Sequence, residues 1–182
     1  GGDLYVGVMT VINSIREVFT LPVSGVTEGA RPVLSYNYGA RRPDRVKETI
    51  RLAAFTAEAI MLLGFAVFQL FPDTALALFN ASEQMLSIGE VALRIISISF
   101  LLAGLSVVFC SVFQALGNGV FSLIVSVCRQ LFVLLPVAWL LAQTGSVNNV
   151  WWAFLISEDV SFLMSLAFYA RINKTTIAPL YH

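Results

Sequence analysis

The sequence predicts an all-α membrane protein with five transmembrane helices, and three observations support this prediction. Hydrophobic residues make up 58% of the 182 residues and charged residues only 12%, whereas an average soluble domain carries about 25% charged residues. Five apolar segments are close to, or longer than, the roughly 20 residues that a helix needs to cross a bilayer. Basic residues gather in a few places between these segments, as they do on the cytoplasmic side of membrane proteins.

The predicted spans cover about residues 4–30, 45–71, 86–116, 119–142 and 148–170. The first span is less apolar than the others because polar and charged residues interrupt it. We expect Gly39 to end the first helix with a positive φ, and Pro43 suits the first turn of the second helix. Gly25 and Gly29 form a GxxxG pattern, which predicts close packing against another helix.

The positions of the basic residues predict how the chain is oriented in the cell (plasma or inner) membrane. Lys and Arg number 11 in all, and six of them flank the loop between the first two spans: Arg31, Arg41, Arg42, Arg45, Lys47 and Arg51. The loop between the second and third spans holds three acidic residues and no base. Because basic residues accumulate inside, we expect the first loop and the C-terminus in the cytoplasm and the N-terminus of this segment outside.

Six ionisable residues are predicted within the spans, at depths where charge is costly. Placing a charged side chain at the centre of a membrane helix costs roughly 2.5–3.5 kcal/mol on insertion scales. Such residues usually face the interior of the protein or an aqueous cavity, and they often mark a pathway for an ion or substrate. They are the candidate ion-coupling or cavity residues of this chain: Arg16, Glu17, Glu58, Arg129, Glu158 and Asp159.

The four acids of this set outnumber the two arginines, so two carboxyl groups lack a basic partner even if both arginines form ion pairs. Burial disfavours the ionised form of a carboxyl group, and we therefore expect at least one to be protonated at neutral pH. Glu58 is the first candidate because it has no neighbouring base in its own span. Glu158 or Asp159 comes next; they point about 100° apart on a helix, so only one of them is expected to face a given cavity.

Structural roles remain as alternatives for these residues. Arg16, Glu17 and Arg129 could tie helices together, and Glu58 could extend toward the cytoplasmic headgroups. Pro22 and Pro136 lie within spans, where a proline leaves the carbonyl four residues earlier without its helical hydrogen bond. We expect these prolines to bend their helices, as in the broken helices of carriers.

The sequence gives no indication of an enzyme, a metal site or a bound cofactor. Its only histidine is His182, so neither a Ser/His/Asp nor a Cys/His arrangement can be drawn. It has no Walker A motif and no Cys/His cluster with metal-ligand spacing. The formal net charge is zero, which gives no reason to expect a nucleic-acid partner.

Three stretches carry a resemblance to a known family. They are "MTVINSIREVFTLPVSGVTEGARPVLSYNYGARRPDRVKETIRLA", "LALFNASEQMLSIGEVALRI" and "FQALGNGVFSLIVSVCRQLFVLLPVAWLLA". The most specific part is the loop Asn37, Tyr38, Gly39 and Ala40 followed by basic residues. These stretches resemble the C-terminal lobe of MATE (multidrug and toxic compound extrusion) transporters. The resemblance covers almost the whole chain, and it implies that residues 1–182 form a partial C-terminal transmembrane lobe with the last five of twelve helices.

The resemblance implies a cation-coupled multidrug antiporter that exports amphipathic, cationic small molecules by alternating access. Its partners would be membrane lipid and the missing N-terminal lobe. Glu28 and Arg31 stand where the family has polar Gln-type residues. Some relatives have an Asp for sodium binding in the stretch that corresponds to Ile95–Leu116, and this stretch has no acid here. This difference favours H⁺ over Na⁺ as the coupling ion, or coupling residues in the other lobe. The alternatives are a lipid-linked flippase of the same superfamily and a small membrane scaffold subunit that does not transport.

Overall fold

The structure is a computed structural model that describes residues 2–78, 82–145 and 151–181, with side chains from residue 6 onward. Helices dominate these ranges, and no strand occurs within them. The elements in chain order are α1 (Gly2–Gly39), α2 (Pro43–Leu70), α3 (Pro72–Leu78), α4 (Glu83–Ala115), α5 (Gly119–Val127), η1 (Cys128–Leu134), α6 (Leu135–Ala142), α7 (Trp152–Ile172), η3 (Asn173–Ile177) and η4 (Ala178–Tyr181).

Five helical stretches are long and apolar enough to cross a membrane, which confirms the all-helical, five-span prediction. They are Val6–Gly39, Pro43–Leu70, Glu83–Ala115, Gly119–Ala142 and Trp152–Tyr181. The first helix extends beyond the predicted span of residues 4–30 and ends at Gly39, as expected for the helix. The predicted start of the last span, at residue 148, lies outside the described residues.

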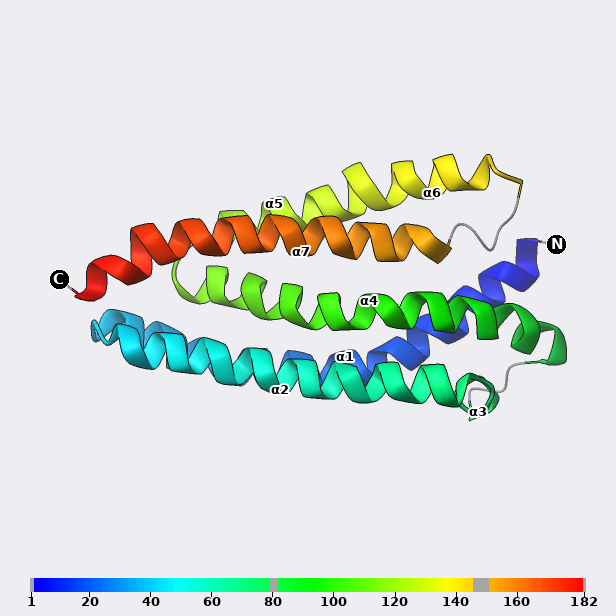
Figure 1. The fold of residues 1–182 in the computed structure, drawn as a ribbon, viewed down its shortest axis with the longest axis horizontal. Coiled ribbons are helices and arrows are strands. Elements are labelled where there is room, and N and C mark those ends of the chain that lie inside the picture. The colour runs from blue at the N-terminus through cyan, green and yellow to red at the C-terminus, as the bar shows by residue number, and fades with distance from the viewer. Residues whose placement is uncertain (1, 79–81, 146–150, 182) are drawn as a thin grey trace.

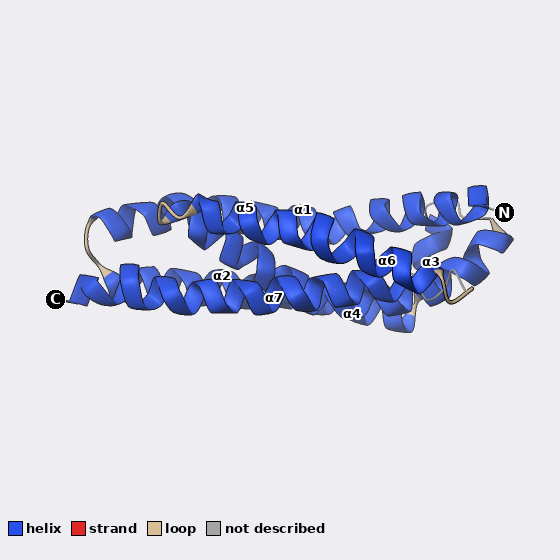
Figure 2. Ribbon diagram, turned by 90° about the horizontal axis from the view of Figure 1, so that it is seen from above, coloured by secondary structure: helices blue, strands red, loops and turns tan. Residues whose placement is uncertain are grey.

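α4 is the central helix of the bundle, and α1, α2, α5 and α7 all pack against it. The two ends of the chain lie at opposite ends of the long axis (Figure 1), as an odd number of spans requires. Seen from above, α1 and α5 lie in one layer, and α2 and α7 lie in the other (Figure 2). Because α1 and α5 lie in one layer and both pack against α4, they border the same face of the bundle.

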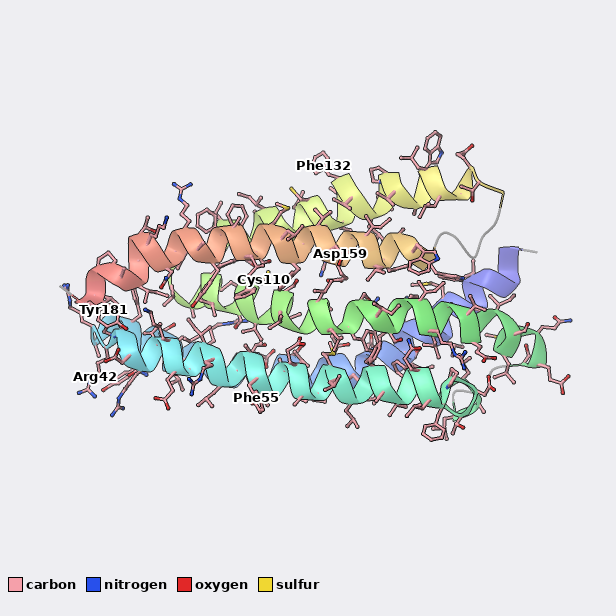
Figure 3. The ribbon with its side chains drawn as sticks, viewed as in Figure 1. Arg42, Phe55, Cys110, Phe132, Asp159 and Tyr181 are labelled. Carbon is pink, nitrogen blue, oxygen red and sulfur yellow. The ribbon has the colours of Figure 1, made fainter. Side chains whose placement is uncertain are left out.

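Aromatic side chains hold the helices together on both sides of α4. On one side, the Phe68 ring meets the edges of Phe19 and Phe100, each with ring centroids 5.3 Å apart. On the other side, the rings of Phe121 and Phe168 stack at 4.6 Å. Other large side chains face outward, as expected of lipid-facing positions; Phe55 and Phe132 are exposed and point away from the bundle (Figure 3).

The hinge between α1 and α2 is a Schellman turn, in which the residue after the helix takes a left-handed backbone conformation. The Arg42 N–H donates to the Asn37 carbonyl at 2.9 Å, and the Arg41 N–H donates to the Tyr38 carbonyl at 3.1 Å. The left-handed residue is Arg41, with φ of 56°. The expectation that Gly39 would take positive φ is therefore wrong, because the helix includes Gly39 and the chain reverses after it.

The C-terminal segment docks onto the start of α2, beside this hinge. The Tyr181 hydroxyl donates to Asp44 Oδ1 at 2.9 Å, and Lys47 Nζ lies 4.9 Å from the centre of the Tyr181 ring. The first loop and the C-terminal segment therefore lie at the same end of the bundle. Pro43 occupies the first turn of α2, as the sequence predicted.

The GxxxG pattern of α1 does not pack as predicted within the described residues. A Cβ atom added at Gly25 or Gly29 would meet nothing within 4 Å. Both glycines are exposed on the surface of α1. The expected close helix contact is therefore absent from the part of the chain that the structure describes, and this face of α1 is open.

Candidate functional site

A polar cleft lies between α1 on one side and α5 with η1 on the other, with α4 and α7 beneath it. It comprises a cavity of about 250 Å³ and a second of about 370 Å³, and Arg129 lines both. The charged and amide side chains that line it are Asn13, Arg16, Glu28, Arg31, Gln114, Arg129, Gln130 and Glu158. Hydroxyl groups from Ser24, Thr27, Ser106, Ser111, Ser122, Ser126, Ser157 and Ser161 complete the polar wall.

An ion pair between Arg129 and Glu158 links the two sides of the larger cavity. Arg129 Nη1 lies 3.6 Å from Glu158 Oε1, and the side chain of Glu158 is only 8% exposed whereas that of Arg129 is 35% exposed. The Ser157 hydroxyl also donates to the Arg129 carbonyl at 3.2 Å. These contacts fix η1 against α7 and bring together two of the residues that the sequence singled out.

The backbone around Arg129 is a π-helix, which is wider than an α-helix. η1 covers Cys128–Leu134, and the Leu135 N–H after it donates to the Gln130 carbonyl five residues earlier. Pro136 follows in the first turn of α6, and because proline has no N–H, the Phe132 carbonyl four residues earlier lacks its α-helical hydrogen bond. π-helical turns occur frequently at functional sites, and here both Arg129 and Gln130 line the cleft.

Arg16 contributes a second guanidinium to the larger cavity, next to Asn13 on α1. Arg16 forms no salt bridge within the described residues, unlike Arg129. The cavity therefore contains two arginines and one glutamate. Such an arrangement suits ligands or neighbouring segments that bring a polar or negatively charged group.

Arg31 is held in the smaller cavity by a chain of hydrogen bonds from α1 to α4. Its Nε donates to Ser111 Oγ at 3.4 Å, and the Ser111 hydroxyl donates to the Thr27 carbonyl at 3.3 Å. On the opposite wall, Gln114 Nε2 donates to Ser122 Oγ at 3.0 Å. This network was not predicted from the sequence, although the serine and threonine content of otherwise apolar spans was a signal for it.

Several buried polar atoms at the cleft have no hydrogen-bond partner within the described residues. They include Ser106 Oγ, Ser161 Oγ and Glu158 Oε2, from side chains that are buried. Buried polar groups in proteins normally have a partner from protein or water. The cleft is therefore suited to polar contents, either water or the polar part of a bound molecule.

Three of the six candidate residues lie outside the cleft, and two of them, Glu17 and Asp159, are exposed neighbours of residues that line it. Glu17 is exposed on α1 although the adjacent Arg16 lines the cavity. Asp159 is exposed on α7 (Figure 3), whereas the adjacent Glu158 is buried. The 100° step between neighbouring helical residues separates both pairs.

Glu58 lies away from the cleft, on the part of α2 that packs against α4. Its Oε1 atom is buried and has no hydrogen-bond partner within the described residues. No ion pair to Glu58 occurs there either. Gly104 of α4 lies directly opposite, since a Cβ atom added at Gly104 would be 3.0 Å from Glu58 Oε1. Glu58 is thus an intramembrane carboxyl group without a counter-charge.

The remaining candidates have structural positions. Pro22 lies within α1, which stays helical through it, and Pro32 is a second proline in the same helix. In the hinge, Asn37 is buried and its Nδ2 donates to the Val33 carbonyl at 2.8 Å. Tyr38 packs partly against the core, and Gly39 and Ala40 are exposed. The hinge residues therefore shape the end of α1 and do not line the cleft.

Comparison with known proteins agrees with this architecture. A family model described as MatE matches residues 2–140. Multidrug export protein MepA of Staphylococcus haemolyticus (strain JCSC1435) is 27% identical over 158 residues, which make up 86% of this chain and 34% of MepA. The chain thus spans about a third of the length of this relative.

Solved structures of transporters have the same fold over nearly the whole chain. The MATE multidrug transporter DinF-BH, solved as a ligand complex, is 30% identical with a TM-score of 0.84, and the match covers 97% of this chain and 39% of that one. Inward-facing and outward-facing structures of a MATE family transporter of the MOP superfamily give TM-scores of 0.84 and 0.87 at 24% identity. These two matches cover 97% and 100% of this chain and 40% of each transporter, and they show the fold alone.

The match to the MatE model extends over most of the chain and includes the hinge, α4 and the π-helical segment with Arg129. The sequence resemblance, the five spans and the fold therefore agree. The chain belongs to the MatE family of membrane transporters.

Proposed function

We propose that this chain is the C-terminal lobe portion of a multidrug antiporter that is coupled to H⁺ rather than Na⁺ and works by alternating access. The similar MepA protein is a multidrug export protein, and this similarity supports multidrug export as the activity. The ligand complex of the multidrug transporter DinF-BH supports a small-molecule substrate. In this proposal the chain crosses the cell membrane with its C-terminus in the cytoplasm, surrounded by lipid and facing the N-terminal lobe.

The observation that supports coupling to protons is that the carboxyl group of Glu58 has no ionic partner among the residues that the structure describes. Glu158 has a guanidinium partner at 3.6 Å, whereas Glu58 has neither an ion pair nor a hydrogen bond to its buried Oε1 within the described residues. A charged carboxylate in such a place is unfavourable unless a proton or a cation neutralises it. Glu58 thus supplies the kind of group that gains a proton in one state of the carrier and releases it in another.

Alternating access requires a lobe that keeps its fold while its surroundings change. The chain matches inward-facing and outward-facing transporters almost equally, with TM-scores of 0.84 and 0.87. This similarity supports a lobe that moves as one body. The polar cleft then provides a surface where hydroxyl groups and charges of both signs could meet the polar part of a substrate.

Dye transport by the intact protein that contains this chain tests the proposal. The protein is reconstituted into liposomes, a pH gradient is imposed, and movement of ethidium, a fluorescent cationic dye, is followed. We expect transport that collapses with the pH gradient, that a sodium gradient does not replace, and that Glu58→Gln abolishes. Glu48→Gln, an exposed glutamate at the start of the same helix, is the matched control and should transport normally. Undiminished proton-driven transport by Glu58→Gln would contradict the assignment.

A flippase for lipid-linked anionic substrates is the second candidate function, and the charges of the cleft favour it. Three arginines, Arg16, Arg31 and Arg129, line the cleft against two glutamates, Glu28 and Glu158. A cationic surface of this kind attracts phosphate groups. Competition distinguishes the two candidates: a flippase would be inhibited by a polyprenyl phosphate and would not move ethidium, whereas the proposed antiporter would move ethidium without such inhibition.

A further inference from the structure

The contact between Glu58 and α4 depends on Gly104, because a glycine has no side chain to fill the space. Gly104 is buried in α4, and a Cβ atom built on it would lie 2.9 Å from Met61 Cγ, 3.0 Å from Glu58 Oε1 and 3.6 Å from the Ala57 carbonyl oxygen. At the two shorter distances an added methyl group would force its neighbours to shift. The carboxyl group of Glu58 therefore occupies space that exists only because residue 104 is a glycine.

The surroundings of this space are apolar and hold no compensating charge. Along α2, Ala57 and Met61 border the same space, since both lie within 4 Å of a Cβ atom built at Gly104, and both are buried. Across the interface, the residues one turn from Gly104 are Phe100 and Val108, and both are buried. Within the described residues, no charged side chain forms a salt bridge with Glu58.

We propose that Gly104 is a positioning residue for Glu58: it leaves room for the carboxyl group at the contact between α2 and α4, so that gain or loss of a proton is linked to the packing of these two helices. The proposal rests on the function proposed for Glu58 and adds what holds that residue in place. A neutral carboxyl fits the space without a partner at modest cost, whereas an ionised one needs water or a cation. Release of the proton should therefore accompany loosening of α2 from α4.

Substitution of Gly104 by Ala should expel the carboxyl group from this space. The added methyl group meets Glu58 Oε1 on one side and Met61 on the other, so the flexible end of Glu58 must move. Outside the space the carboxyl gains access to polar surroundings, and its ionised form becomes easier to reach. The pH at which Glu58 is half protonated should fall by roughly one unit.

Infrared titration of the purified intact protein measures this directly. The carbonyl stretching band of protonated Glu58 is identified by its loss in Glu58→Gln, and its intensity is followed against pH. In Gly104→Ala the band should disappear at lower pH than in the wild type. Gly89→Ala is the matched control, because its Cβ would lie 2.9 Å from Leu76 Cδ1 and Gly89 belongs to the same helix as Gly104; it strains a purely apolar contact and should leave the titration unchanged.

Glu58→Asp provides a second variant that adds no bulk and so does not depend on tolerance of Ala at position 104. Its shorter side chain withdraws the carboxyl from Gly104, and we expect a shift in the same direction. An unchanged midpoint in both Gly104→Ala and Glu58→Asp would overturn the proposal, as would an equal shift in Gly89→Ala. The test is separate from the transport assay: a shifted titration with normal proton-driven transport in Glu58→Gln would keep the positioning role and reject the proposed coupling.

Discussion

The charged residues of the transmembrane helices differ in whether an oppositely charged side chain lies beside them. This difference decides what each residue can do. Arg129 and Glu158 meet at 3.6 Å, whereas Glu58 faces a glycine. The sequence predicted all of these charges at membrane depth, because a charged residue is conspicuous in an apolar run. It could not predict which of them meet, because Arg129 and Glu158 lie on different helices and only the packing of η1 against α7 brings them together.

Loss of the Arg129 guanidinium should destabilise the protein strongly. Glu158 is 8% exposed, and removal of one partner from a buried ion pair typically costs about 3–5 kcal/mol because the other charge stays buried. Since Arg129 is partly exposed, we expect Arg129→Ala to cost about 3 kcal/mol. Unfolding of the detergent-solubilised protein, followed by circular dichroism, measures this loss.

A second arginine–glutamate pair serves as the control for this prediction. Arg94 and Glu90 lie 3.3 Å apart with side chains 50% and 37% exposed, and such exposed pairs contribute about 0–1 kcal/mol. Arg94→Ala should therefore change the free energy of unfolding little. The double variant Arg129→Ala with Glu158→Gln should recover part of the loss, because no buried charge remains. Equal losses in Arg129→Ala and Arg94→Ala would contradict the account of the cleft.

At the scale of an element, the turns that end α1 and α4 differ in how well a glycine in the sequence predicts the left-handed residue. Of two Schellman turns in the described residues, one has Arg41 in the left-handed position, and the other has Gly117 with φ of 83°. In the second, the Asn118 N–H donates to the Phe113 carbonyl at 2.7 Å. Glycine correctly marks the end of α4, but at the end of α1 the nearby Gly39 is helical, because hydrogen bonds and packing place the reversal two residues later.

The two turns predict opposite responses to substitution. A left-handed backbone costs a non-glycine residue roughly 1–2 kcal/mol, so Arg41→Gly should stabilise the protein by about 1 kcal/mol and Gly117→Ala should destabilise it by about as much. Thermal unfolding of the two variants in detergent measures both effects. Gly39→Ala is the control and should not destabilise, because Gly39 has no positive φ; destabilisation by Arg41→Gly would contradict the assignment of the turn.

The π-helix η1 is an element that the residue pattern could not predict. Pro136 indicated a disturbance of its span, and the structure has one, but the disturbance lies before the proline at Cys128–Leu134. Nothing in the residue pattern distinguishes a bend from a wider turn. That distinction matters because the widened turn contains Arg129 and Gln130, which line the cleft.

At the scale of the whole molecule, the number of spans was predictable and their arrangement was not. Apolar length alone gives five candidate helices, as observed. The central place of α4 follows from contacts with α1, α2, α5 and α7. The cleft exists because α1 and α5 both rest on α4 and polar side chains line the cavity between them. Such contacts between distant segments leave no local pattern in the sequence, although the family resemblance implied the fold.

A lobe that moves as one body should keep its internal distances through the transport cycle. Phe55 on α2 and Phe132 on η1 are exposed and point away from the bundle (Figure 3), so cysteines at these positions can carry spin labels when Cys110 and Cys128 are replaced by serine. Double electron–electron resonance should give the same distance distribution between the two labels at acidic and neutral pH and with or without ethidium. A label pair with one member outside this segment in the intact protein is the control and should respond; a shift of the 55–132 distance would contradict rigid-body movement.

The most direct test of the central claim, that Glu58 exchanges a proton for substrate, is proton release on binding of a cationic dye. The intact purified protein is placed in weakly buffered detergent solution with a pH indicator, and ethidium is added. We expect proton release by the wild type and by Glu48→Gln, and none by Glu58→Gln. Proton release by Glu58→Gln equal to that of the wild type would contradict it and would assign the coupling to another residue.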